Sequence, residues 1–191
     1  FYDGMSTADI QGILVKSASD LIDLESPNYQ YVAARLLLYG LRKNLYGRLH
    51  ELPVLMEQIK RGIGKGIYDV DILKKYTETE IESLDNIIDH HRDYLFTYAG
   101  LRQVVDKYLV QDRSSGQVYE TPQFMYMLIA MTIFAEYPPE SRLDYVTRYY
   151  NAISRHKINI PTPIMGGVRT PIRQFASCVL VDIDDTLDSI F

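Results

Sequence analysis

Apolar residues recur every three or four positions along most of the chain, which is the spacing that lines one face of an α-helix. This pattern predicts amphipathic helices over residues 6–23, 29–46, 52–63, 76–91 and 140–155. Turn formers separate these segments, and capping residues such as Ser and Thr precede several of them. We therefore expect a mainly α-helical chain.

One further segment is apolar on every side. The run FMYMLIAMTIFA covers residues 124–135, and Thr121-Pro122 before it supplies a cap and a proline at the first helical position. A helix that is hydrophobic all round is buried in the core. The run is shorter than the roughly 20 residues that span a membrane, so we expect neither a membrane span nor a membrane partner.

Three segments break the helical pattern. Residues 108–120 predict a small hairpin with its turn at Ser-Ser-Gly, and residues 159–174, with three prolines and a Gly-Gly pair, predict a loop. Residues 175–183, FASCVLVDI, are mostly apolar on both faces and predict a buried strand. Such a strand needs neighbours that one hairpin cannot supply, so we expect a truncated architecture, ending where TLDSIF begins another helix.

Composition narrows the class of function. The 191 residues carry a net charge of −5, which argues against broad binding to nucleic-acid phosphates. The single cysteine excludes an intramolecular disulfide framework and a cysteine-rich zinc site, and it fits a reducing compartment.

Two short motifs suggest sites that their spacing does not support. GIGKG (62–66) is too short for a phosphate-binding P-loop, and no Ser or Thr follows its lysine. The pair His90–His91 stands between Asp89 and Asp93, but adjacent residues do not share a helix face. We expect a loop at the first and no metal at the second.

A basic cluster stands at the end of the second predicted helix. The cluster lies at the C-terminal end of that helix, where cations complement the helix dipole. Its members are Arg42 and Lys43, before Gly47, and Arg48, directly after it. Taken alone, this is the pattern of a solvated helix end.

The stretch VLVDIDDTL (179–187) resembles the first motif of haloacid-dehalogenase-type phosphatases. In that family Asp182 would be the nucleophile and Asp184 the general acid, with Thr186 assisting. The fold of that family places its sheet and its remaining acids after the motif, whereas four residues follow Leu187 here and no βαβ alternation precedes it. The phosphatase is therefore a distant third interpretation.

A much longer signature surrounds that motif. Residues 159–190, NIPTPIMGGVRTPIRQFASCVLVDIDDTLDSI, resemble the large, catalytic subunit of class Ia ribonucleotide reductase of the bacterial and large-phage type. Blocks at 1–10, 27–47, 89–100, 107–124 and 142–154 resemble successive parts of the same subunit, so the likeness covers nearly the whole chain.

The resemblance implies a slice of a longer subunit with three parts. Residues 1–46 would be the C-terminal part of an ATP-cone, and residues 47–173 the helical N-terminal domain with its small hairpin. Residues 174–191 would be the first strand and helix start of an α/β ten-stranded barrel. The slice would be a cloned fragment, a split-gene product or an incomplete record, and the sequence leaves these open.

Roles for individual residues follow only from the resemblance. Cys178 matches one member of the redox-active cysteine pair, and Thr162 and Ser177 match positions that contact the substrate. Adjacent residues face opposite sides of a regular strand, so Ser177 would act partly through its backbone, or the strand would be irregular.

The resemblance also implies nucleotide effector sites. Asp185, Thr186 and Leu187 match a specificity site for deoxynucleoside triphosphates at a dimer interface. Thr7 and Lys43 match ATP-contacting positions of the cone, while Asp182 and Asp184 match no assigned position.

The function implied is the reduction of ribonucleoside diphosphates to deoxyribonucleotides by radical chemistry, under control by ATP and dNTP effectors. The implied partners are a second large subunit, a small subunit holding the metal and tyrosyl-radical cofactor, and thioredoxin or glutaredoxin. The location would be the cytoplasm, or a host cytoplasm for a phage protein. We expect the chain alone to be inactive and to need the rest of the subunit, supplied in some cases as a separate chain. The alternative is a non-catalytic module that binds a nucleotide or a partner.

Overall fold

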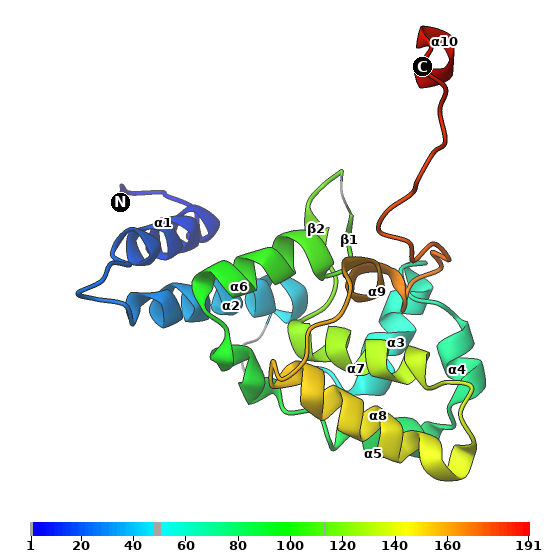
Figure 1. Ribbon diagram of the computed structural model, residues 1–191. Helices are drawn as coiled ribbons and strands as arrows, with labels where there is room; N and C mark the ends of the chain where they lie inside the picture. The colour runs from blue at the N-terminus through cyan, green and yellow to red at the C-terminus, as the bar shows by residue number, and fades with distance from the viewer. Residues whose placement is uncertain (1, 48–50, 113) are drawn as a thin grey trace.

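The computed structural model describes residues 2–47, 51–112 and 114–191. The regular secondary structure of this part of the chain is helical apart from one two-stranded hairpin, so the prediction of a mainly helical fold is confirmed (Figure 1). The longer helices are α1 (Thr7–Asp20), α2 (Tyr29–Tyr46), α3 (Leu55–Gly64), α5 (Glu78–Asp85), α7 (Pro122–Ile133) and α8 (Pro139–Ser154). The shorter elements are α4 (Asp71–Lys75), the 3-10 helix η1 (His90–Leu95), α6 (Tyr98–Gln103), the π-helical turn η2 (Val104–Tyr108), α9 (Thr162–Gly167) and α10 (Leu187–Ile190).

Helix α7 is the centre of the core. Its residues 122–131 are all buried, and it packs against α8, η1 and α9 (Figure 1). Because its apolar residues face every direction, α7 cannot leave any side to water. The prediction of a buried helix opened by Pro122 is therefore confirmed.

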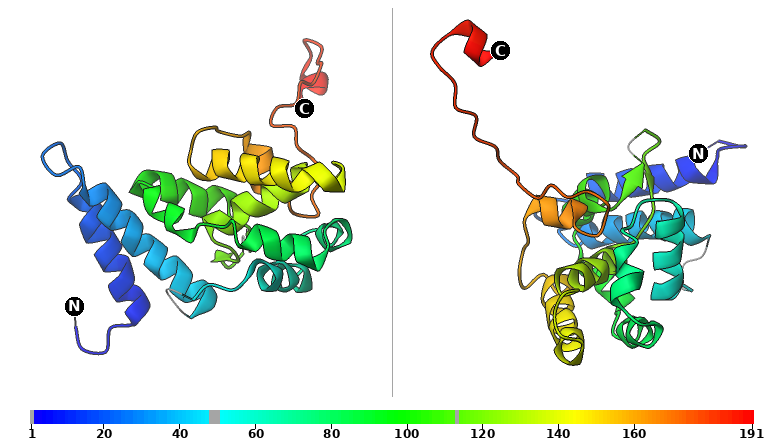
Figure 2. Two further views of the ribbon diagram at one scale, coloured as in Figure 1. Left: turned by 90° about the horizontal axis from the view of Figure 1, so that it is seen from below. Right: turned by 90° about the vertical axis from the view of Figure 1, so that its right-hand side faces the viewer.

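Helices α1 and α2 form an antiparallel pair at one side of the molecule (Figure 2). Gly40 lets the two approach closely, because a Cβ there would lie 3.1 Å from the side chain of Gln11. That glutamine donates a hydrogen bond to the carbonyl of Leu36. On its other side α2 packs against α6, which joins the pair to the rest of the fold.

Local caps fix several helix ends where the sequence predicts them. Ser6 accepts a hydrogen bond from the backbone N–H of Asp9 at the start of α1. Thr77 and Glu80 form a reciprocal capping box at the start of α5. Gly47 ends α2 in the left-handed conformation, with φ at 68°.

The helix predicted over 76–91 is too long. Helix α5 ends at Asp85, and a separate 3-10 helix, η1, begins at His90. The carboxylate of Asp89 accepts the backbone N–H of His91 at 3.1 Å. Such local bonds from Asp to the backbone compete with helical ones, which accounts for the interruption.

The hairpin is confirmed, although it is short. Strand β1 (Gln111–Asp112) pairs antiparallel with β2 (Gln117–Val118), and Gly116 between them has a φ of 70°. The Asp112 carboxylate accepts hydrogen bonds from the side chain and backbone N–H of Ser114, which lower its pKa to about 2.

The two predictions for the C-terminal part are partly wrong. Residues 162–167 form α9 rather than loop, because Pro163 lies in the first turn, where its missing N–H costs nothing. Residues 175–183 form no strand, although all are described; they run extended and exposed away from the body (Figure 1). A strand needs a partner, and the described residues offer none beside this segment. The start of a helix at TLDSIF is confirmed as α10.

Within the described ranges, no helix is long and apolar enough to cross a membrane.

Candidate functional site

Thr162 lies at the start of α9, with its hydroxyl exposed beside that of Tyr108 at the end of η2. The two oxygens are 3.3 Å apart. The hydrogen bond with Thr162 and the nearby charge of Lys107 lower the pKa of the Tyr108 phenol. The structure therefore presents a threonine hydroxyl and an acidified tyrosine hydroxyl together at the surface.

A single buried arginine supports the backbone of both α9 and Tyr108 beneath this contact. The guanidinium of Arg169 donates to the backbone carbonyls of Met165, in α9, and Tyr108, at 2.5 Å and 2.8 Å. Its Nε also lies 3.0 Å and 3.1 Å from the two carboxylate oxygens of Glu120, and both side chains are fully buried. The position of Thr162 beside Tyr108 is thus fixed from below by one ion pair.

Glu120 extends this support into α3. One carboxylate oxygen accepts the backbone N–H of Val110 at 2.8 Å, and the other accepts the hydroxyl of Tyr68 at 2.7 Å. Gln58 of α3 donates to the same tyrosine hydroxyl at 2.8 Å. Burial raises the pKa of Tyr68 well above its ordinary value, so this hydroxyl keeps its proton and donates it to the carboxylate.

Thr162 borders an open hollow of about 710 Å³ that Lys107, Tyr108, Gln111 and Gln174 also line. Hydroxyl, amide and ammonium groups of this kind donate hydrogen bonds to anionic oxygens. The hollow therefore has the chemistry to receive a phosphate or a sugar hydroxyl.

Ser177 and Cys178 lie on the exposed C-terminal tail, residues 174–191, and neither lines the hollow beside Thr162. The Ser177 Oγ and the Cys178 Sγ are 3.8 Å apart, and the cysteine is free and exposed. The structure does not bring the three predicted substrate and redox residues into one site.

The predicted specificity residues lie at the start of α10 on the same tail. Thr186 caps this helix by accepting the backbone N–H of Ser189 at 3.2 Å, while Asp185 and Leu187 are exposed. Asp182 and Asp184 are exposed as well, and no parallel sheet forms in the part of the chain that is described. The geometry of a haloacid-dehalogenase-type site is therefore missing there.

Thr7 and Lys43 are exposed, the first at the start of α1 and the second in the last turn of α2. These two helix ends lie at the same end of the antiparallel pair (Figure 2). The structure thus brings the two predicted ATP-contacting residues to one region.

Arg42, next to Lys43, is not solvated, so the prediction of a solvated helix end is wrong for this residue. Its side chain is buried, and its Nη2 donates to the carboxylate of Asp93 and to the carbonyl of His90, each at 2.8 Å. The reason is that this face of α2 packs against η1, which supplies both acceptors. Arg48, the third member of the cluster, lies outside the described residues.

No three potential metal ligands gather anywhere in the described ranges. Asp93 is occupied by Arg42 and by Gln123, which donates to its other oxygen at 2.9 Å. His90 packs edge-on against Phe124, with ring centroids 4.9 Å apart, and burial lowers its pKa to about 4. The side chains of His90 and Asp93 therefore stabilise the packed interior of the fold through ring packing and hydrogen bonds.

Sequence reasoning missed Arg169, Glu120 and Tyr108. Arg169 and Glu120 are 49 positions apart, so no local spacing links them. The one available signal was a lone arginine in the small, uncharged stretch GGVRT, since a charge that becomes buried needs a partner.

Comparison with known proteins agrees with the sequence signature. Residues 94–173 match the ribonucleotide reductase all-alpha domain. The chain is 50% identical over 190 residues to ribonucleoside-diphosphate reductase 1 subunit alpha of Escherichia coli K12, covering 100% of this chain and 25% of that protein. The alpha subunit of Haemophilus influenzae gives the same figures. The alpha subunit of Enterobacteria phage T4 is 48% identical over 188 residues, covering 98% of this chain and 25% of that protein.

The chain thus spans about a quarter of the length of these curated relatives. The match to the all-alpha domain and the high identity along the whole chain point the same way. Along its whole length the chain therefore corresponds to the N-terminal quarter of a class Ia ribonucleoside-diphosphate reductase alpha subunit.

Proposed function

We propose that this chain contributes substrate contacts and one redox thiol to the catalytic subunit of a ribonucleotide reductase. Thr162 and Ser177 contact the diphosphate and ribose of the substrate, and Cys178 is one of two cysteines that supply electrons. The observation that carries this proposal is the anchoring of Thr162 by the buried Arg169–Glu120 pair, within a chain half identical to such subunits.

The proposed reaction replaces the 2′-hydroxyl group of the ribose by a hydrogen atom. The bond from C2′ to oxygen breaks, a bond from C2′ to hydrogen forms, and the oxygen leaves as water. Two thiols lose their protons and two electrons and become a disulfide, which thioredoxin or glutaredoxin reduces. The small subunit supplies the radical. Cys178 is the single cysteine of this chain, so its redox partner belongs to the remainder of the catalytic subunit.

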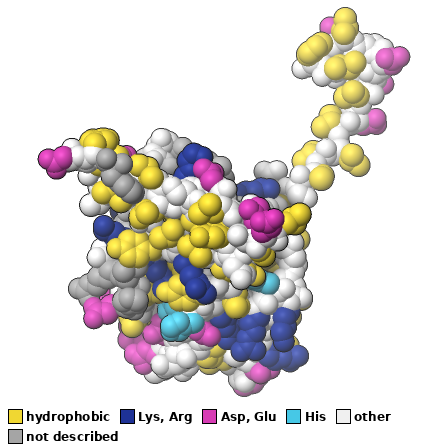
Figure 3. Space-filling model, turned by 90° about the vertical axis from the view of Figure 1, so that its left-hand side faces the viewer, with side chains coloured by type: hydrophobic (Ala, Val, Ile, Leu, Met, Phe, Trp, Pro, Cys, Tyr) yellow, Lys and Arg dark blue, Asp and Glu magenta, His cyan; other side chains and the backbone are white. Residues whose placement is uncertain are grey.

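The C-terminal tail has the exposed apolar side chains expected of a barrel strand whose neighbouring strands belong to another part of the subunit. Val179 is 70% exposed and Leu180 is 99% exposed, and Figure 3 shows hydrophobic side chains uncovered along the projecting tail. We infer that residues 174–191 pair with strands of the remaining subunit, which would bury these side chains. Residues 47–173 are then the helical domain and residues 1–46 part of an ATP-cone.

Two effector sites follow from the same proposal. Asp185 accepts a hydrogen bond from the deoxyribose hydroxyl of a deoxynucleoside triphosphate, with Thr186 and Leu187 beside it at the interface of two large subunits. Thr7 and Lys43 contact ATP, and the meeting of their helix ends at one end of the α1–α2 pair supports this role.

A reconstitution assay tests the proposal. The chain is mixed with a polypeptide carrying the remaining three quarters of such a subunit and with the small subunit, and cytidine diphosphate reduction is measured. We expect turnover from the mixture and none from the chain alone. Thr162→Val should raise KM, whereas Thr79→Val, at an exposed threonine on α5, should leave it unchanged.

Turnover by the chain alone would contradict the proposal, as would unchanged kinetics in Thr162→Val. Nucleotide binding without restored turnover would favour a non-catalytic binding module instead.

A further inference from the structure

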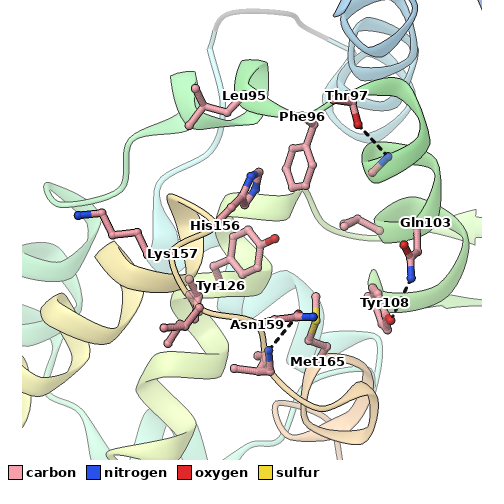
Figure 4. A pocket seen from close by; sticks show the side chains of 15 residues that line it. Leu95, Phe96, Thr97, Gln103, Tyr108, Tyr126, His156, Lys157, Asn159 and Met165 are labelled. Atoms are coloured by element: carbon pink, nitrogen blue, oxygen red, sulfur yellow. Dashed lines mark hydrogen bonds between the residues drawn. The ribbon is translucent and has the colours of Figure 1, made fainter. Parts of the chain in front are cut away.

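A second hollow, of about 550 Å³, opens between η1, α6, α7 and the segment that follows α8 (Figure 4). Tyr108 borders it as well as the hollow at Thr162, but the rest of its lining is different. Its volume falls in the range of small-molecule sites, roughly 300–1,000 Å³. Nothing in the proposed reductase function uses it.

Aromatic rings form much of its wall. Phe96 and Tyr126 are 6% and 5% exposed, and the imidazole of His156 packs on Phe96 with ring centroids 4.5 Å apart. Met165 closes the far side (Figure 4). Flat rings and a thioether favour a planar ligand that makes contact over its face.

The most informative group is the hydroxyl of Tyr126. The residue is almost completely buried, yet this hydroxyl has no hydrogen-bond partner among the described residues, and Figure 4 shows it pointing into the hollow. Burial raises the pKa of Tyr126, so the hydroxyl keeps its proton. Because this hydroxyl reaches the open hollow rather than the closed core, water can pair with it, and a ligand that displaces this water must offer an acceptor atom in its place.

Acceptors face the same space. The amide nitrogen of Gln103 lies 3.4 Å from the Tyr108 hydroxyl, and its amide oxygen has no partner within the described part of the chain. Burial lowers the pKa of His156, so this imidazole is neutral and offers one donor and one acceptor. Lys157 belongs to the lining, but in Figure 4 its ammonium group points away from the rings, so no cation among the described residues faces the ligand space.

His156 also occupies a backbone conformation that suits glycine. Its φ is 55°, because the chain turns here at the end of α8, where Lys157 N–H bonds to the Ala152 carbonyl at 2.9 Å. Glycine adopts this conformation freely, and histidine is among the other residues that adopt it most often. The turn places the imidazole against Phe96 at the wall of the hollow.

We propose that this hollow binds a neutral, planar nitrogen heterocycle of one or two rings. The ring lies against Phe96 and His156, its acceptor nitrogen accepts a hydrogen bond from the Tyr126 hydroxyl, and its N–H donates to the amide oxygen of Gln103. A purely apolar ligand would displace water from the tyrosine hydroxyl without replacing its hydrogen bond, and a charged ligand would find no counter-ion facing it.

The test is a titration of the 191-residue chain with 2-aminopurine, which carries no sugar or phosphate. The chain contains no tryptophan, so the probe can be excited beyond tyrosine absorption without protein background. We expect a saturable fluorescence change. Tyr126→Phe removes the hydroxyl alone and should weaken binding about tenfold. Tyr149→Phe, which alters a partly buried tyrosine outside the hollow, should not weaken it.

His156→Gly should weaken binding to a similar degree while leaving the melting temperature equal or higher, because glycine relieves the positive φ. The proposal is overturned if 2-aminopurine causes no saturable change. It is also overturned if naphthalene binds as tightly as 2-aminopurine, or if folded Tyr126→Phe binds as tightly as the parent chain.

Discussion

Arg169 and Glu120 face one another with no exposed surface on either side chain, and they join α9 to the segment that leads into α7. Because Arg169 also bonds to the carbonyls of Met165 and Tyr108, this one pair places the exposed hydroxyl of Thr162. A surface site thus depends on a charge pair beneath it.

Removing one member of that pair should be strongly destabilising. Arg169→Met leaves the Glu120 carboxylate buried without its cation, and we expect the free energy of unfolding to fall by about 3–5 kcal/mol. Urea unfolding measures this. Arg148→Met is the control, because Arg148 and Asp144 are 3.5 Å apart at the surface, and it should change stability by at most about 0.5 kcal/mol. Equal effects of the two changes would show that the buried pair is not needed.

Gly62 should not tolerate a side chain. A Cβ there would lie 2.1 Å from the ring of Tyr68, which Gln58 and Glu120 hold in place. We expect Gly62→Ala to lower the free energy of unfolding by about 1–3 kcal/mol, although alanine is the better helix former.

Gly64 in the same helix provides the matched control. Its Cβ would meet no described atom within 4 Å, so Gly64→Ala should be neutral or slightly stabilising. A stable Gly62→Ala variant would mean that Tyr68 packs differently.

The neighbours Arg42 and Lys43 should behave in opposite ways. Arg42→Met removes the partner of the buried Asp93 and should cost about 3–5 kcal/mol. Lys43→Met, at an exposed position, should change the free energy of unfolding by less than about 0.5 kcal/mol. Urea unfolding of both variants checks this, and a large loss in Lys43→Met would show that its side chain supports the fold.

His90 should make the protein less stable in mild acid. Burial, followed by the charge of Arg42, lowers its pKa to about 4, whereas the unfolded chain has a value of about 6.5. Between these values the unfolded state binds the extra proton, so stability falls as the pH falls. We expect a loss of roughly 2 kcal/mol across this window, since the imidazole is only partly buried. Denaturant unfolding at several pH values should show a smaller slope for His90→Gln, and equal slopes would refute the assignment.

The sequence predicts well whatever depends on neighbouring residues. The bounds of α2, the buried α7 opened by Pro122, and a threonine cap at the start of α5 all follow from spacing and local hydrogen bonding. The shortening of α5 does not, because the side chain of Asp89 competes with the helix for a backbone N–H.

What depends on distant residues was beyond the sequence. Arg42 has the pattern of a solvated helix end, and only the packing of η1 against α2 buries it. The strand predicted over 175–183 has the right composition but no neighbour in the described structure. The support of Thr162 by Arg169 joins elements whose contact no periodicity reveals.

The most direct test of the central claim is the reconstituted reductase assay with Cys178→Ser and with thioredoxin as the only reductant. The parent chain, mixed with the remainder of the subunit and the small subunit, should reduce cytidine diphosphate over many turnovers. Cys178→Ser should lose those turnovers, because serine cannot form the disulfide that thioredoxin reduces. Equal steady-state rates for the two chains would contradict the assignment of Cys178 as a redox residue.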